Sequence, residues 1–142
     1  AMTKVNVPRR KGEDGNWQAV TVPDHADILC ELANGGQAHM RFSAITGCSP
    51  GTEAWLYGSE GTIYIDQQMN VFGARKGEKA LTEIPNPADG QHYWRVEQEF
   101  INAIRGEEPI TRTPFSVGVH YMEFTEAVTR SAQTGQAIAL PL

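Results

Sequence analysis

Two glycines flank a polar pair in the stretch Gly58-Ser59-Glu60-Gly61. Glycine-rich loops cradle phosphates when they join a strand to the N-terminus of a helix, whose N–H groups then point at the anion. The residues after Gly61 are Thr-Ile-Tyr-Ile-Asp, which favour a strand, and neither a lysine nor a third glycine completes a nucleotide-binding motif. The spacing therefore predicts a β-hairpin turn and no phosphate site.

Four histidines could supply metal ligands or proton transfer, but their spacing is unfavourable for both. They form no H-E-x-x-H motif and no pair four residues apart, whereas a metal site needs two or three converging ligands. The sequence therefore predicts no metal site, and each histidine is interpreted as a surface or structural residue. The four are His25, His39, His92 and His120.

Nucleophilic catalysis finds no support either. The chain has no G-x-S-x-G elbow, and its two cysteines, Cys30 and Cys48, lie far apart and outside any C-x-x-C frame. Cys30 falls in an alternating apolar pattern and is expected to be a small buried hydrophobic residue. We predict no catalytic residue in this chain, and the cysteine usage favours a cytoplasmic protein.

One segment gathers side chains that suit a ligand. Gln91-His92-Tyr93-Trp94-Arg95 combines an imidazole, a phenol, an indole and a guanidinium at the expected start of a helix. These groups suit a polyhydroxylated molecule, which offers hydroxyls for hydrogen bonds and a ring face for stacking. The alternative is a helix N-terminus that its aromatic side chains anchor against a sheet. His92 and Tyr93 are the candidate substrate residues.

Composition excludes several partners. The chain has 142 residues, 40% hydrophobic and 20% charged, which is ordinary for one globular domain. Its formal net charge of −5 and the lack of a basic face argue against nucleic acid. There is no apolar run long enough for a membrane span and no signal-peptide pattern. Ala1 is interpreted as a tag remnant, and a single domain is expected over residues 3–142.

Alternation of apolar and polar residues predicts a long hairpin in the first half of the chain. Apolar residues take every second position from Asp24 to Leu32, and Gln37 to Ile45 repeats the pattern. Asn34-Gly35-Gly36 between them tolerates the positive φ angles of a tight turn. Shorter strands are predicted over 4–7, 17–22, 52–57, 62–66, 70–75, 80–84 and 136–140.

The period changes after the irregular linker at 85–90. Apolar residues then recur at helical spacing from Tyr93 to Ile104, Asp89 is a candidate N-cap, and Gly106 supplies the stop. A second helix is expected to begin at Thr113-Pro114, with the threonine as its cap, and to end at Gly135.

This order of elements predicts an α+β domain. Two main helices would pack on one face of an open, predominantly antiparallel (mixed) sheet. The rows on the other face are both aromatic and polar, a composition typical of interfaces. We expect a homo-oligomer that forms through this open face; the alternative is a solvated face with incidental aromatic residues. The face is defined by His39, Arg41, Trp55, Tyr57 and Tyr64.

Four stretches in sequence resemble the C-terminal domain of the Gfo/Idh/MocA oxidoreductases, the glucose–fructose oxidoreductase and inositol dehydrogenase-like enzymes. They are "DHADILCELANGGQAHMRFS", "LYGSEGTIYID", "YWRVEQEFINAIRGEEPI" and "EAVTRSAQTGQAIALPL", and they extend the resemblance over nearly the whole chain. The resemblance implies the open-sheet fold of a glyceraldehyde-3-phosphate dehydrogenase-like C-terminal domain. In this family the domain shapes a substrate pocket and joins subunits through its open sheet face.

The resemblance also implies what a parent protein would do. An N-terminal Rossmann domain would bind NAD or NADP, and the substrate would be a sugar, a cyclitol or a related small polyhydroxylated compound. Tyr93 takes the place of a family tyrosine that borders the substrate, with His92 where an alanine is usual.

The departures from the family pattern limit the expected activity. This chain has neither the Rossmann glycine fingerprint nor the Glu-Lys-Pro segment that carries the catalytic lysine, and it begins after the family's Asp-x-x-x-His helix. It is therefore expected to bind no cofactor and to be inactive alone. The alternative is a standalone β-rich binding or assembly module without dehydrogenase activity.

Overall fold

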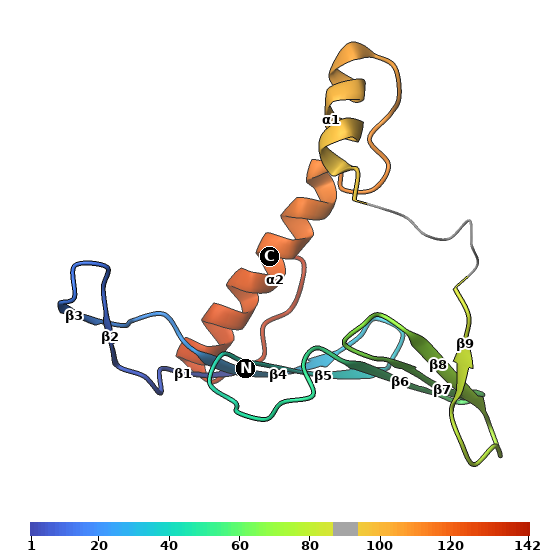
Figure 1. The fold of residues 1–142 in the computed structure, drawn as a ribbon, viewed down its shortest axis with the longest axis horizontal. Coiled ribbons are helices and arrows are strands. Elements are labelled where there is room, and N and C mark those ends of the chain that lie inside the picture. Colours follow the sequence, from blue (N-terminus) through green and yellow to red (C-terminus); the bar gives the residue numbers. More distant parts are fainter. Residues whose placement is uncertain (87–93) are drawn as a thin grey trace. The chain divides into compact units, whose positions relative to one another are not determined.

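The computed structural model describes residues 1–86 and 94–142 of the chain (Figure 1). These residues form two compact units, residues 1–46 with 96–142, and residues 47–95. The described elements are nine strands and two helices, and all the strand pairs are antiparallel. The α+β class and the antiparallel strands predicted from the sequence are therefore confirmed.

The first unit contains the predicted long hairpin. Strands β4 (His25–Glu31) and β5 (Gln37–Ser43) pair along their full lengths, and β1 (Met2–Lys4) adds to the free edge of β4. Gly35 has a φ of 83° in the turn, and its N–H donates to the Leu32 carbonyl at 2.8 Å. A left-handed residue there favours glycine, so the Asn-Gly sequence specifies this turn.

The strand predicted over residues 4–7 is wrong. Strand β1 ends at Lys4, and the N–H groups of Asn6 and Val7 instead donate to the carboxylate of Asp24, at 2.9 and 2.8 Å. The chain continues into a separate small hairpin, β2 (Arg9–Lys11) with β3 (Trp17–Ala19). A side chain distant in sequence therefore takes the backbone donors that a sheet would have used.

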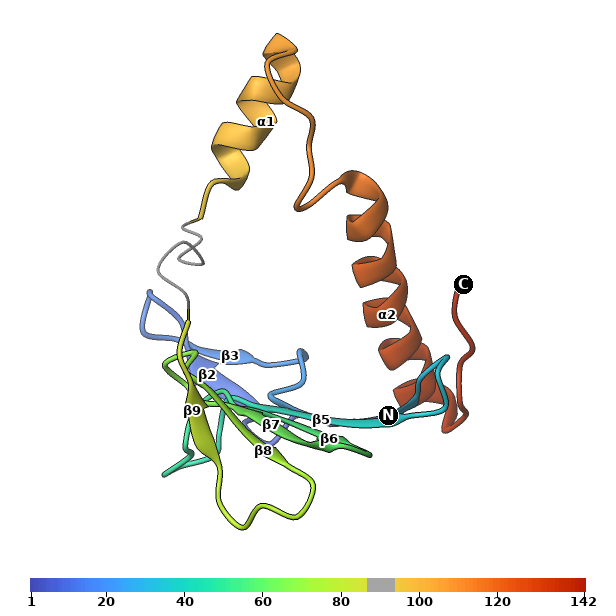
Figure 2. The same cartoon turned by 90° about the vertical axis from the view of Figure 1, so that its right-hand side faces the viewer.

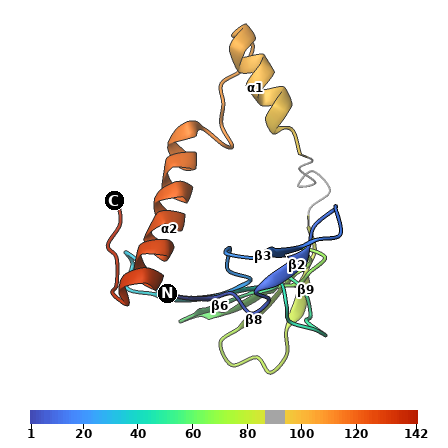
Figure 3. The same ribbon diagram turned by 90° about the vertical axis from the view of Figure 1, so that its left-hand side faces the viewer.

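Helix α2 (Phe115–Thr134) provides the rest of this unit's core. It contacts β1, and its residues Ala127 and Ser131 are buried, as is Ile28 of β4 at 5% exposure. In Figures 2 and 3 the C-terminal end of α2 lies beside the chain's N-terminus. The hydroxyls of Thr125 and Thr129 donate to helix carbonyls one turn earlier, at 2.9 and 3.0 Å.

The two ends of α2 differ in how well the sequence predicts them. Gly135 stops the helix as expected, with a φ of 71° and its N–H donating to the Ser131 carbonyl. The predicted threonine cap is wrong, because Pro114 occupies the N-cap position and no side chain caps the helix. The final strand predicted over 136–140 is also wrong. Those residues pair with no strand and run back alongside α2 (Figures 2 and 3).

Helix α1 (Val96–Arg105) ends where Gly106 adopts a φ of 73°, as the sequence predicts. Its buried Glu99, 4% exposed, accepts hydrogen bonds from the Thr111 hydroxyl at 2.8 Å and from the Thr111 and Arg112 N–H groups at 3.2 Å. These bonds tie the segment before α2 to α1. The candidate cap Asp89 lies outside the described residues, and packing of α1 on a sheet stays a prediction.

The second unit is a meander of four strands. It comprises β6 (Ala54–Gly58), β7 (Gly61–Ile65), β8 (Val71–Arg75) and β9 (Thr82–Ile84). Gly58 pairs with Gly61, so Ser59 and Glu60 form a two-residue turn between strands, as predicted. A β-carbon on Gly61 would collide with the Ala74 carbonyl oxygen, and this close approach requires glycine.

The strands belong to three hydrogen-bonded sheets, of three, two and four strands, where the sequence predicts one. The chain between β5 and β6 contains no strand over residues 44–53, which have two glycines and a proline, so the ladder is interrupted in sequence. Neither described helix is long and apolar enough to cross a lipid bilayer.

Candidate functional site

Four aromatic side chains form a continuous row on one face of the second unit's sheet. This aromatic row consists of Tyr57 and Trp55 on β6, Tyr64 on β7 and Phe72 on β8. The register places Trp55 opposite Tyr64 and Tyr64 opposite Phe72. Ring centroids are 6.0 Å apart for Trp55–Tyr57, 4.2 Å for Trp55–Tyr64 and 5.8 Å for Tyr64–Phe72. Cross-strand aromatic pairs of this kind stabilise a sheet and order its surface.

The rings are held in place but still accessible. Trp55 is 44% exposed and Tyr57 is 77% exposed. The Tyr64 hydroxyl donates to Glu53 Oε2 at 3.1 Å, and burial, with this carboxylate, raises the pKa of Tyr64 above its ordinary value. The rings of Trp55 and Tyr64 lie against one another, so the ring faces in contact are not free to stack on a sugar. The row is better suited to an apolar protein surface than to a carbohydrate platform.

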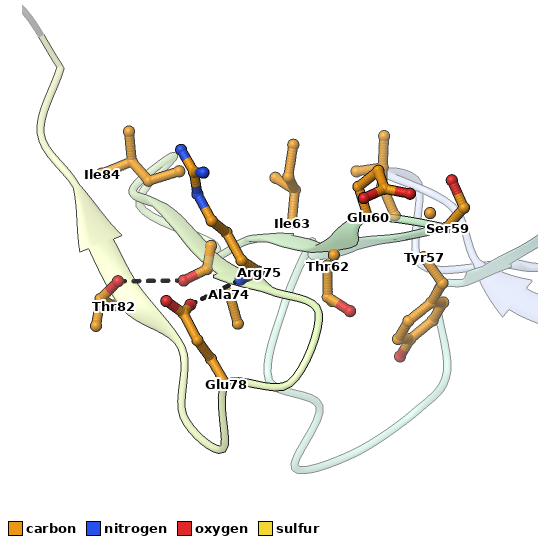
Figure 4. Close-up of a pocket in the computed structure, with 14 residues that line it drawn as sticks. Tyr57, Ser59, Glu60, Thr62, Ile63, Ala74, Arg75, Glu78, Thr82 and Ile84 are labelled. Carbon is orange, nitrogen blue, oxygen red and sulfur yellow. Dashed lines mark hydrogen bonds between the residues drawn. The ribbon is translucent and has the colours of Figure 1, made fainter.

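The other face of the same sheet is aliphatic. Leu56, Ile63 and Ile84 are each about half exposed there and border a shallow hollow. Figure 4 shows Arg75 pointing to the same side as Ile63 and Ile84. Two hydrogen bonds stabilise the connection between β8 and β9. The Thr82 hydroxyl donates to the Gly73 carbonyl at 3.2 Å, and the Arg75 N–H donates to Glu78 Oε2 at 2.7 Å.

The turn at Ser59-Glu60 lines this hollow without forming a phosphate site. Strand β7 follows the turn directly, so the N-terminus of a helix, which would concentrate N–H groups on an anion, does not follow it. The hairpin predicted at these glycines is confirmed.

In the first unit, three side chains converge on one carboxylate. Asp27 Oδ1 accepts from Arg41 Nε at 2.8 Å and from His39 Nε2 at 3.3 Å, and Oδ2 accepts from His25 Nε2 at 2.9 Å. Because Arg41 and Asp27 are cross-strand partners in β4 and β5, the hairpin register brings them together. We call Asp27, His25, His39 and Arg41 the carboxylate cluster.

The electrostatics of this cluster favour an ionised Asp27. The Arg41 hydrogen bond, followed by the His25 bond, holds the pKa of Asp27 well below its ordinary value, although partial burial acts in the opposite direction. An ionised carboxylate only accepts hydrogen bonds, so both imidazoles donate from Nε2.

The cluster has no nucleophile in a catalytic arrangement. Ser43 is the cross-strand partner of His25, but its Oγ accepts from the Thr46 hydroxyl at 2.8 Å and from the Ile45 N–H at 3.4 Å. Within residues 1–86 and 94–142, no three histidine, cysteine or acidic side chains are placed to hold a metal ion. The thiols of Cys30, which is half-buried, and Cys48, which is exposed, are free. Asp27, His25, His39 and Arg41 therefore form a network of charged and polar side chains.

The structure divides the five predicted interface residues into two groups. Trp55, Tyr57 and Tyr64 meet in the aromatic row of the second unit, whereas His39 and Arg41 meet around Asp27 in the first. The candidate substrate residues His92 and Tyr93 lie outside the described residues.

Sequence reasoning missed three members of these groups: Phe72, His25 and Asp27. The sequence shows their residue types and predicts the strands they belong to, but it does not directly show the register between the paired strands. A residue count outward from the Asn34-Gly35 turn would have placed Asp27 opposite Arg41, because the turn geometry fixes the pairing.

No family model matches the chain, and no curated protein matches it. The function must therefore be argued from the residues and their geometry.

Proposed function

We propose that this chain is an assembly and substrate-shaping domain, and that copies of it join through the face that carries the aromatic row. The observation that carries the proposal is the row itself: four aromatic residues ordered across three strands, with Trp55 and Tyr57 accessible. Tryptophan and tyrosine are the residue types that most often anchor protein interfaces.

A second feature supports a covered sheet. None of the described residues 47–86, 94 and 95 is buried, although the four strands carry apolar side chains on both faces. A sheet gains most of its stability when a hydrophobic face is packed against another element or another chain. Association through the aromatic row would supply that packing on one face.

The wider identity rests on the resemblance to the Gfo/Idh/MocA C-terminal domain. On this proposal the fold is of the glyceraldehyde-3-phosphate dehydrogenase-like C-terminal type. A Rossmann domain in the parent protein holds NAD or NADP, and the substrate is a sugar or cyclitol. Tyr93 and His92 border that substrate. The antiparallel hairpins and the two helices that follow them are compatible with this assignment.

Size-exclusion chromatography with light scattering tests the assembly of the whole chain. Trp55→Asp places a charge at the centre of the aromatic row, and we expect it to convert the oligomer to a monomer. Loss of a central tryptophan anchor typically costs at least about 2 kcal/mol of association free energy, which is roughly a thirtyfold weaker Kd.

Trp17→Asp is the matched control. Trp17 on β3 is 66% exposed, more than Trp55, and it lies outside the aromatic row. The control variant should elute with the wild type. A wild-type chain that is monomeric at high micromolar concentration, or an unchanged mass for Trp55→Asp, would contradict assembly through the row.

A further inference from the structure

Strand β6 forms one edge of the four-stranded sheet and carries two residues of the aromatic row. Among residues 1–86 and 94–142, β7 is the only strand that pairs with β6, so no described strand occupies its other side. β6 contains no charged residue and no proline, and its register with β7 is uninterrupted. The opposite edge strand, β9, has three residues, one of them Glu83, and Pro85 follows it. Because short length, charge and proline protect an edge, β6 is the unprotected edge of this sheet.

The hydrogen-bond pattern shows which backbone groups of β6 point to its free side. Just before β7 and just after β8, the Lys76 N–H donates to the Glu60 carbonyl at 2.8 Å. Backbone groups of successive residues point to opposite sides of a strand, so alternate residues of β7 bond to β8 and the others, such as Ile63, bond to β6. The β6 partner of Ile63 is Leu56, whose N–H and C=O therefore point to β7. The residues of β6 whose N–H and C=O groups point to the free side are Trp55 and Tyr57.

The side-chain pattern of β6 is the same in both directions. A small residue at each end encloses an aromatic residue on each side of a central leucine, in the stretch Ala54-Trp55-Leu56-Tyr57-Gly58. Antiparallel pairing of two copies about Leu56 places Trp55 of one copy opposite Tyr57 of the other, and small residues oppose small ones. Just beyond the strand, Glu53 opposes the uncharged Ser59, so like charges are not set against one another. This symmetry fits a two-fold contact, in which the same surface serves on both sides, so the occupant that fits β6 is a second copy.

We propose that two copies of this chain join by antiparallel pairing of their β6 strands, edge to edge, about a two-fold axis at Leu56. This inference rests on the proposed function, because it names the contact at which the aromatic rows of two copies meet. Trp55 of each copy exchanges both backbone hydrogen bonds with Tyr57 of the other. The accessible rings of the two rows then lie side by side across the joint. Because each outer edge is then the short, charged β9, the assembly closes as a dimer.

Disulfide cross-linking of Leu56→Cys distinguishes edge pairing from packing of one aromatic row on another. Edge pairing makes the two copies of residue 56 a non-hydrogen-bonded pair, with Cα atoms about 4.5 Å apart, which a disulfide can bridge. The free thiols are removed by Cys30→Ala and Cys48→Ser. We expect diamide, which takes up the two thiol hydrogens, to link most of the chain into a covalent dimer. Packing through the aromatic row would leave Leu56 on the far side of each sheet and give no linked dimer.

Ile63→Cys in the same background is the matched control. Ile63 is the cross-strand partner of Leu56 on the same face, and the two are 43% and 53% exposed. Figure 4 shows Ile63 and Tyr57 on opposite sides of the sheet. Edge pairing separates the two copies of Ile63 by three strand spacings, about 14 Å, which is too far for a disulfide. The control should therefore stay unlinked, and equal linking of both variants would overturn the proposal.

Amide hydrogen exchange of the wild-type chain gives a second readout that needs no substitution. It is followed residue by residue by NMR at low and at high micromolar concentration. The N–H groups of Trp55 and Tyr57 should exchange at least about tenfold more slowly at the higher concentration, because they gain partners only in the dimer. The Leu56 N–H, which bonds to β7, should be protected at both concentrations.

The outcomes separate this inference from the proposed function. A chain that associates, but in which Leu56→Cys stays unlinked or the Trp55 and Tyr57 N–H groups exchange equally fast at both concentrations, overturns edge pairing and leaves assembly intact. A chain that is monomeric at both concentrations overturns assembly as well. Linking confined to Leu56→Cys, together with concentration-dependent protection of Trp55 and Tyr57, supports both.

Discussion

Single carboxylates organise the first unit at several points where the backbone leaves regular structure. Asp24 receives the N–H groups of Asn6 and Val7 and the Asn6 side-chain amide, and Glu99 receives two backbone N–H groups beyond α1. Each therefore replaces a strand or helix as the partner of main-chain donors. Charge-assisted bonds of this type are stronger than bonds between neutral groups.

Acid sensitivity should follow from Asp24. The Asn6 backbone bond, with the other two bonds, lowers its pKa from 3.8 to about 2. A carboxyl group with a depressed pKa contributes stability above its unfolded pKa, and that contribution is lost as the pH falls from 3.8 toward 2. We expect Asp24→Asn to lower the melting temperature at pH 7 and to flatten its decline between pH 4 and pH 2, as measured by circular dichroism.

Asp14→Asn is the matched control for this prediction. Asp14 is exposed, and its carboxylate accepts hydrogen bonds from the backbone and side chain of Asn16, two residues away in the same turn. The melting temperature of Asp14→Asn at pH 7 should be close to that of the wild type. Equal losses for the two variants would show that Asp24 contributes no more than an exposed turn residue.

At the scale of the elements, one glycine inside α2 and one at its C-cap differ in what their backbone conformations require. Gly135 adopts a φ of 71° at the C-cap, whereas Gly118 lies inside the helix with nothing within 4 Å of the position of an added β-carbon. Gly135→Ala should destabilise the chain by about 1–2 kcal/mol because alanine disfavours left-handed backbone. Chemical denaturation followed at 222 nm measures this change.

Gly118→Ala supplies the opposite sign in the same helix. Alanine loses less backbone entropy than glycine on entering a helix, so this variant should gain about 0.5–1 kcal/mol. If both substitutions shifted stability in the same direction, the conformations assigned to the two glycines would be incorrect.

The elements that could be predicted from the sequence are those specified by neighbouring residues. The Asn34-Gly35 turn and the glycine stop of α2 depend on left-handed backbone, and at the Gly58–Gly61 turn Gly61 leaves no side chain to collide with the neighbouring strand; all three predictions are confirmed. The expectations for 4–7 and 136–140 failed for a different reason. A strand exists only with a partner, and β-propensity in a short segment does not supply one.

The candidate site could be predicted only in part for the same reason. Alternation placed Trp55, Tyr57 and Tyr64 on one face, and the structure groups them there. The convergence on Asp27 depends on register between two strands, which is a pairing property and not a property of either strand.

For the whole molecule, the proposed function makes a prediction about cofactor binding. Dinucleotide sites need a glycine-rich turn between a strand and the N-terminus of a helix, and the turn at Ser59-Glu60 instead joins two strands. Titration of NADH or NADPH with the purified chain, followed by cofactor fluorescence, should give no saturable binding. A dehydrogenase with a complete Rossmann domain serves as the parallel positive control. Micromolar binding by this chain would contradict the assignment of the cofactor site to another part of the parent protein.

The threonine hydroxyls of α2 determine how polar the helix surface is toward another molecule. Thr125 and Thr129 are one turn apart, and each hydroxyl proton is already engaged by a carbonyl of the same helix. Removal of water from such hydroxyls forfeits little hydrogen bonding, since the donor stays satisfied in a non-aqueous environment. This stretch of α2 therefore behaves toward an approaching surface more like alanine or valine than its formal polarity suggests.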